Sequence, residues 1–168
     1  MPGATAASSL SNRAIAEYAE RVGVHHNVYS ALGRADLDGL VSVLGGRVEE
    51  SNALVAPEAL TVYAPGHFTV HLPLVTSDRR DRFTIAHELG HYFLHYLYPK
   101  HENAQVFGRG ERNRAETEAN VFASSLLMPE KKFREAVQTF GTDWWKVGDV
   151  FGVSPSAASV RAQVLGID

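Results

Sequence analysis

Residues 84–96 read TIAHELGHYFLHY, an apolar run with histidines at positions 87, 91 and 95 and a glutamate at position 88. In an α-helix, residues four apart lie one above the other, so the imidazoles of His87 and His91 can converge on one metal ion. Glu88 then lies about 100° round the helix from His87, beside the ion. The HExxH spacing therefore predicts a helix that carries two metal ligands and a general base, Glu88.

A third metal ligand has to come from elsewhere, because a catalytic zinc site typically has three protein ligands. His95 would lie about 12 Å from His87 along a straight helix, too far to share an ion whose bonds are roughly 2 Å long. We therefore expect His95 to cap or buttress the end of the helix.

The next helical pattern, RAETEANVFASSLLM (114–128), offers two glutamates. Glu116 and Asn120 are four residues apart, so a liganding Glu116 places Asn120 where it can support a ligating imidazole. Glu118 lies about 200° round the helix from Glu116, so the two cannot face one metal ion. We predict that Glu116 is the third ligand, with Glu118 as a solvated alternative.

The two segments together resemble the ImmA/IrrE family of metallopeptidases. The similarity runs over RFTIAHELGHYFLH (82–95) and ETEANVFASSLLMP (116–129), and more weakly from residue 58 to the closing VFGVSPSAASVR. The resemblance implies a zincin-like fold, with a small sheet that forms the substrate cleft and a helical C-terminal part. It also implies metal binding by His87, His91 and Glu116 and catalysis by Glu88, in agreement with the helix geometry.

The family resemblance implies a zinc endopeptidase with a narrow substrate. Such a substrate is a helix-turn-helix transcriptional repressor, cleaved to relieve repression in a phage, mobile element, stress-response or toxin–antitoxin setting. Zinc is the default ion for two histidines and a carboxylate, although manganese or iron could occupy such a site. Peptide hydrolysis passes through a negatively charged oxyanion, which the metal ion and a second hydrogen-bond donor would stabilise. Four candidates for that second donor stay open: His67, His71, Tyr92 and Arg161.

The order of predicted elements gives an α+β protein with a small antiparallel sheet. Apolar spacing predicts helices over 13–23 and 36–46, and then a hairpin over 58–74 around Ala64-Pro65-Gly66. We expect its strand 67–74 to bind substrate in extended form. A long helix to about Tyr98, a loop over 99–113, the helix 114–128 and three shorter helices follow.

This layout suggests one domain in three parts. Residues 1–12 are expected to be a flexible tail, 13–129 the zincin-like core, and 130–168 a helical subdomain with helix-turn-helix-like spacing. Residues 130–168 carry five basic and five acidic side chains, which gives no surplus of positive charge for phosphate groups. Direct binding to nucleic acid is therefore not expected.

Composition removes several other classes of site. The chain of 168 residues has no cysteine, which excludes disulfides, thiolate metal sites and cysteine nucleophiles.

The first dozen residues lack the apolar segment of a signal peptide, and no run of 18 apolar residues occurs, so we expect a cytoplasmic protein without membrane contact. The alternatives to a peptidase are a zinc-binding interaction module and a transcriptional regulator; the intact Glu88 favours the enzyme.

Overall fold

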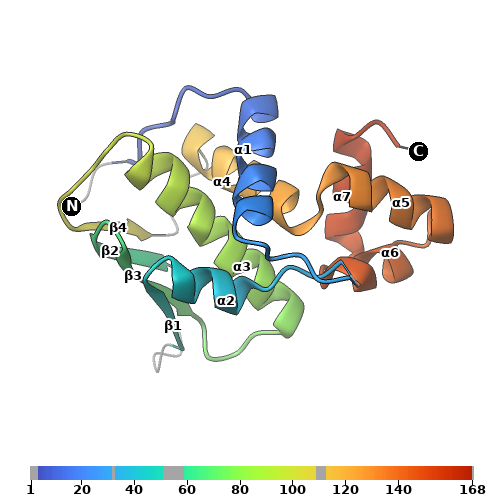
Figure 1. Cartoon of the computed structure of the whole chain (residues 1–168), viewed down its shortest axis with the longest axis horizontal. Coiled ribbons are helices and arrows are strands. Elements are labelled where there is room, and N and C mark those ends of the chain that lie inside the picture. Colours follow the sequence, from blue (N-terminus) through green and yellow to red (C-terminus); the bar gives the residue numbers. More distant parts are fainter. Residues whose placement is uncertain (1–3, 32, 51–58, 109–112, 168) are drawn as a thin grey trace.

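The computed structural model describes residues 4–31, 33–50, 59–108 and 113–167. These residues form an α+β structure, which confirms the class predicted from the sequence. Figure 1 shows the sheet at one end of the molecule, longer helices in the middle and a group of shorter helices at the other end. The elements, in chain order, are α1 (Asn12–His25), α2 (Leu37–Val43), β1 (Gly46–Glu50), β2 (Ala59–Ala64), β3 (His67–Leu72), α3 (Asp78–His91), the π-helix η1 (Tyr92–Leu97), β4 (Gln105–Gly108), α4 (Arg114–Leu127), α5 (Glu130–Phe140), α6 (Trp144–Phe151) and α7 (Pro155–Val164).

The sheet has the order β1-β3-β2-β4 and is mixed rather than antiparallel. The predicted hairpin is confirmed as β2 and β3, joined at Pro65-Gly66, although residue 58 lies outside the described residues. The predicted small antiparallel sheet is corrected in one respect, since β1 pairs with β3 in parallel. The sequence GRVEE of β1 contains Val48 as its one large apolar residue, so its hydrophobic alternation is too short to reveal a strand.

Strand β4 lies within the predicted loop 99–113, which is therefore corrected for residues 105–108; residues 109–112 lie outside the described part. The sequence QVFG gives only a weak strand signal, because just one of its two large apolar residues, Phe107, is buried while Val106 is exposed. Pairing with β2 therefore determines that this segment is a strand. Strand β3 lies between β1 and β2, so it cannot be the free edge expected to bind a substrate. β1 and β4 are the outer strands of the described sheet.

The helices begin where hydrogen-bonding side chains precede them. Ser77 accepts a hydrogen bond from the backbone N–H of Arg80 at the start of α3, and Asn113 accepts one from Glu116 N–H at the start of α4. Ser154 caps α7, and Pro155 occupies its first turn. The predicted long helix does continue past His91, but its last part is the wider π-helix η1.

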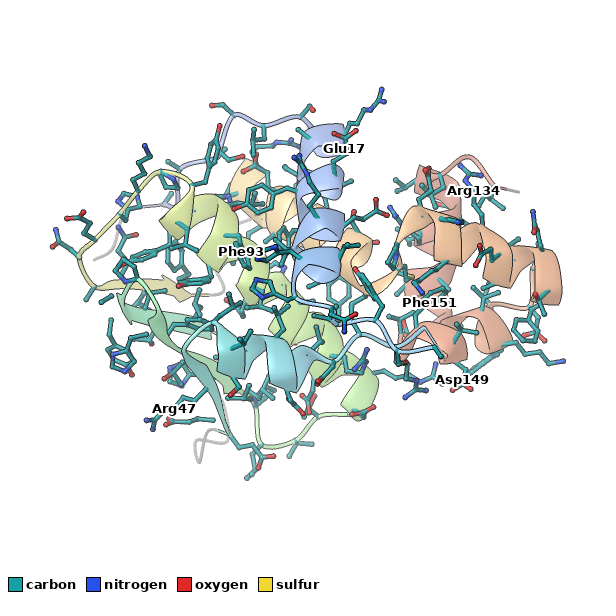
Figure 2. The ribbon with its side chains drawn as sticks, viewed as in Figure 1. Glu17, Arg47, Phe93, Arg134, Asp149 and Phe151 are labelled. Atoms are coloured by element: carbon teal, nitrogen blue, oxygen red, sulfur yellow. The ribbon has the colours of Figure 1, made fainter. Side chains whose placement is uncertain are left out.

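The core forms where α4 packs against both α3 and α1, and where α3 packs against β2 and β3 of the sheet. Leu89, Phe93, Phe122 and Leu126 are buried in this core, whereas Phe83 is half-buried at its margin. Figure 2 shows Phe93 inside the helical layer near α1. This packing fixes α3 against α4, the two helices that carry the predicted metal ligands.

Helices α5 to α7 form the end of the molecule opposite the sheet (Figure 1). Phe133 and Phe151 stack there and belong to the same hydrophobic cluster as the rest of the core. Arg79 and Arg82 of α3 donate hydrogen bonds to the carbonyl oxygens of Val153 and Phe151, which ties α6 to the motif helix. The domain boundary at residue 129 stays a prediction. Within the described ranges, no helix is both long and apolar enough to cross a membrane.

Candidate metal centre

Three predicted ligands converge where α3 crosses α4. The Nε2 atom of His87 lies 3.1 Å from Glu116 Oε2, and the Nε2 atom of His91 lies 2.9 Å from Glu116 Oε1. One ligand atom from each residue lies within 4.8 Å of the other two. His91 is buried, while the side chains of His87 and Glu116 are 15% and 21% exposed, so the site opens toward solvent on one side.

The other nitrogen of each imidazole has a partner within the protein. The Nδ1 atom of His87 lies 2.8 Å from Asn120 Oδ1, and the Nδ1 atom of His91 lies 2.9 Å from His95 Nδ1. If each Nδ1 carries the proton, each Nε2 presents a lone pair to a carboxylate oxygen that also has only lone pairs. A metal ion between them would then satisfy all four atoms, and two imidazoles with one carboxylate match the donor set of a divalent metal ion.

The electrostatics of the three groups favour an ionised glutamate between two histidines. Burial favours the protonated form of Glu116, but hydrogen bonds with His87 and His91 outweigh it and hold the pKa of Glu116 below its usual range. Burial lowers the pKa of His91. Burial also opposes a charge on His87, yet contact with Glu116 and the nearby charge of Glu88 leave the pKa of His87 raised.

Glu88 lies next to His87 on α3, and its catalytic role stays a prediction. It follows His87 in α3 and is 3% exposed, so its carboxyl group is held in a site with little water. Its charge acts on His87, which places the carboxylate within electrostatic range of the cluster. This arrangement can supply a proton acceptor beside a bound ion.

The structure revises the roles expected for His95 and Glu118. His95 lies outside the three-residue cluster, as predicted, but it contacts His91 rather than capping the end of the helix. Glu118, predicted to be solvated, is fully buried, and its Oε1 atom lies 2.8 Å from His95 Nε2. The prediction of a surface glutamate failed because Ser8, from a segment 110 residues away, closes over this side of α4.

The four candidates for a second oxyanion donor have other partners. The hydroxyl group of Tyr92 accepts a hydrogen bond from Gly66 N–H, and Arg161 donates one to the carbonyl oxygen of Met128. His71 lies 3.0 Å from Thr61 Oγ1, and the ring of His67 contacts the ring of Tyr63 in a tilted arrangement. These contacts give each of the four side chains a structural role.

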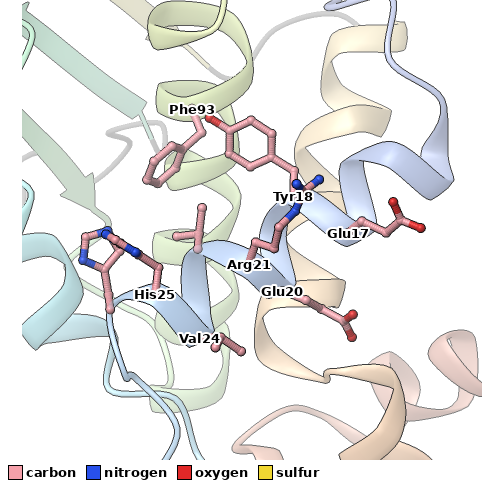
Figure 3. A pocket seen from close by; sticks show the side chains of 9 residues that line it. Glu17, Tyr18, Glu20, Arg21, Val24, His25 and Phe93 are labelled. Atoms are coloured by element: carbon pink, nitrogen blue, oxygen red, sulfur yellow. The ribbon is translucent and has the colours of Figure 1, made fainter.

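The cavity beside β4 is linked to the cluster through Phe107, although no cluster residue lines it. The cavity has a volume of about 520 Å³ and is lined by residues that include Thr5, Thr61 and Phe107. Phe107 stacks on the ring of His91 at a centroid distance of 5.7 Å. The groove along α1, about 990 Å³, has Tyr18 and Phe93 in its wall (Figure 3), and no cluster residue lines it.

Gly90 sets the distance between the two ligand-bearing helices. A Cβ atom at this position would lie 3.0 Å from both Cα and the carbonyl oxygen of Ala119 on α4. We expect Gly90→Ala to destabilise the fold by about 1–2 kcal/mol, because overpacking outweighs the gain in helix propensity. We also expect weaker metal binding, since α4 and Glu116 must move away from α3.

Chemical denaturation and metal titration of Gly90→Ala test this role. Gly108→Ala is the control, because a Cβ atom at Gly108 meets nothing within 4 Å. Unchanged stability and unchanged metal affinity in Gly90→Ala would show that α3 and α4 are not held together by this close contact.

The comparisons with known proteins match the chain to metallopeptidases. Residues 44–163, more than half of the chain, match the family model described as the IrrE N-terminal-like domain. The chain is 32% identical over 89 residues to the radiation response metalloprotease IrrE of Deinococcus radiodurans; this covers 47% of the chain and 25% of that protein. It is 36% identical over 59 residues to the metallopeptidase ImmA of Bacillus subtilis, which covers 35% and 34%.

The chain spans about a quarter of the length of one of these relatives and a third of the other. The family match is broader, since it extends from the end of α2 through α7 and includes both ligand-bearing helices. The fold, the cluster of two histidines and a glutamate, and the family match agree: the chain belongs to the ImmA/IrrE family of metallopeptidases.

Proposed function

We propose that this protein is a zinc-dependent endopeptidase in which His87, His91 and Glu116 bind the metal ion and Glu88 is the catalytic residue. This proposal rests on the two imidazole Nε2 atoms, which converge on one carboxylate. The Nδ1 atom of each ring contacts another protein side chain, which fixes the orientation of the ring. Zinc suits this donor set, because its catalytic sites combine histidine with glutamate and leave a position for water.

The chain's own residues supply the proton transfers and the orientation of the site. A divalent ion bound there contributes Lewis acidity and makes a water molecule more acidic. Glu88 accepts a proton from the attacking water and delivers it to the leaving amine. Asn120 keeps the ring of His87 oriented through the 2.8 Å hydrogen bond at Nδ1.

Strand β4 is the proposed binding edge for the substrate. Among the described strands it pairs only with β2, so its outer edge can accept an extended peptide by adding a strand. The stacking of Phe107 on His91 places this edge next to the cluster. A substrate bound here has to present an extended segment, as an exposed loop or an interdomain linker does.

The proposed substrate is a helix-turn-helix transcriptional repressor in the cytoplasm, cleaved so that repression ends. The family resemblance supports this proposal, and so does the edge strand, since a linker between repressor domains can adopt an extended form. Cleavage would serve a phage, a mobile element, a stress response or a toxin–antitoxin pair.

A transcriptional regulator that binds DNA directly is the second candidate, because α6 and α7 have helix-turn-helix-like spacing. Gly152 makes the turn between them with a φ of 69°. Arg161, however, is buried at 4% exposure and donates its Nε hydrogen to Met128 O. The one basic side chain of α7 is therefore not available for phosphate, which favours the peptidase.

The test is to incubate the zinc-loaded protein with the repressor encoded beside its own gene. We expect cleavage in an exposed linker, loss of cleavage after chelation, and recovery when zinc is added back. Binding to the repressor without cleavage under any metal condition would support an interaction module instead. A salt-sensitive shift of promoter DNA by the protein alone would support the DNA-binding regulator.

A further inference from the structure

We propose that Glu118 and His95 are positioning residues that fix the orientation and the proton position of His91, and that Ser8 holds this pair in place. The inference rests on the proposed function, in which His91 is a metal ligand. It concerns a chain of four residues, Ser8, Glu118, His95 and His91, that connects the N-terminal segment to the metal site.

The contacts in this chain are short and continuous. Ser8 donates two hydrogen bonds to Glu118, one from its backbone N–H to Oε1 at 2.8 Å and one from its hydroxyl group to Oε2 at 2.7 Å. Glu118 Oε1 lies 2.8 Å from His95 Nε2. The other nitrogen of that ring, His95 Nδ1, lies 2.9 Å from His91 Nδ1.

The chemistry of the groups determines where each proton lies. An ionised carboxylate only accepts hydrogen bonds, so His95 must carry its proton on Nε2 and donate it to Glu118. A neutral His95 then has a lone pair on Nδ1, which accepts a proton donated by His91 Nδ1. His91 is thereby held with Nδ1 protonated and with the lone pair of Nε2 directed at the cluster, as metal binding requires.

The burial of this chain argues for a specific role. The side chains of His95 and Glu118 are both 0% exposed, and burying a carboxylate is costly unless it is paired and hydrogen-bonded. Glu118 has Ser8 and His95 as partners, and Arg114 Nε lies 3.6 Å from its Oε2 atom. Apolar residues of similar size often stabilise such positions as well as a buried polar pair does. Packing alone therefore does not require this arrangement.

The π-helix η1 contributes to this arrangement. His91 is the last residue of α3, and His95 lies within η1, where the Tyr98 N–H donates to Phe93 O and the His101 N–H donates to Tyr96 O, five residues back. Such wider turns occur frequently at functional sites. Within this segment, His95 contacts His91 on one side and Glu118 of α4 on the other.

The test compares His95→Gln with His95→Leu. A glutamine can accept the proton of His91 Nδ1 with its amide oxygen and donate to Glu118 with its amide nitrogen, whereas leucine can do neither. We expect His95→Leu to weaken zinc binding by about 10–100-fold. His95→Gln is expected to stay within about threefold of the wild type, because it preserves both hydrogen bonds. Zinc affinity is measured by competition with a chelator.

Two further measurements separate positioning from general stability. Unfolding of the metal-free variants reports the fold, and ¹H–¹⁵N spectra of the zinc-loaded proteins report the His91 Nδ1 proton. We expect slow exchange of that proton in the wild type and His95→Gln, and fast exchange in His95→Leu. Ser8→Ala, which keeps the backbone donor and removes the hydroxyl group, is expected to weaken zinc binding by a few-fold.

The proposal is overturned if folded His95→Leu binds zinc as tightly as the wild type, or if His95→Gln binds as weakly as His95→Leu. If His95→Leu does not fold, His95→Gln and Ser8→Ala are compared with the wild type instead. A loss of zinc affinity in His95→Gln, or an unchanged zinc affinity in Ser8→Ala, would then contradict the proposed positioning role. Failure of the wild type to bind zinc would instead contradict the proposed function.

Discussion

Replacing Glu88 by glutamine is expected to lower the rate of peptide-bond cleavage by about 10²–10⁴-fold, the usual contribution of a general acid–base residue. Glutamine has almost the same size as glutamate but cannot accept the proton of the attacking water. Glu88 is not in the three-residue cluster, so zinc affinity is expected to change little. Initial cleavage rates and zinc content of the purified variant measure the two effects separately.

Glu17→Gln is the matched control, because Glu17 is more than half exposed on α1 and pairs with Arg13. We expect this control to cleave at the wild-type rate. Equal cleavage by Glu88→Gln and Glu17→Gln would remove Glu88 from the mechanism. Loss of zinc from Glu88→Gln would show that this carboxylate binds the metal ion.

Replacing Glu116 by glutamine is expected to weaken zinc binding by more than about 100-fold. Loss of a residue that only hydrogen-bonds to a metal ligand already lowers metal affinity by about 10–100-fold, and loss of a ligand itself should cost more. The variant removes the negative charge that faces both imidazole Nε2 atoms. Cleavage is expected to be lost at stoichiometric zinc and partly restored by excess zinc. Chelator competition and activity at increasing zinc concentration provide the measurement.

Thr117→Ala is the control for Glu116→Gln, since Thr117 is the next residue on α4 and faces solvent. Unfolding of the metal-free forms shows whether a loss of zinc follows from a loss of fold. Wild-type zinc affinity in a folded Glu116→Gln would exclude Glu116 as a ligand and reopen the question of the third donor.

The sequence predicted the helices well because their signals are local. Apolar spacing, capping residues such as Ser154 and the proline that follows it define each helix within its own segment. β1 and β4 were missed for the opposite reason. Each is short, with few apolar residues, and is ordered by hydrogen bonds to strands that are distant in the sequence. The parallel pairing of β1 with β3 has no local signal at all.

In the candidate site, too, some residues have a local sequence signal and others do not. His87, His91 and Glu116 could be predicted because helical spacing places ligands on one face and the family motif links the two segments. The surroundings of His95 and Glu118 could not. Their roles depend on the π-helix η1 and on Ser8, which lies 110 residues from Glu118. No pattern within either motif reports such a contact, so Glu118 resembles any other glutamate on an amphipathic helix.

Crystallography of the zinc-loaded protein at the zinc absorption edge tests the central claim most directly. We predict one strong anomalous peak per chain, about 2 Å from the Nε2 atoms of His87 and His91 and from a carboxylate oxygen of Glu116. A single peak elsewhere, or none in crystals that contain one zinc ion per chain, would contradict the account.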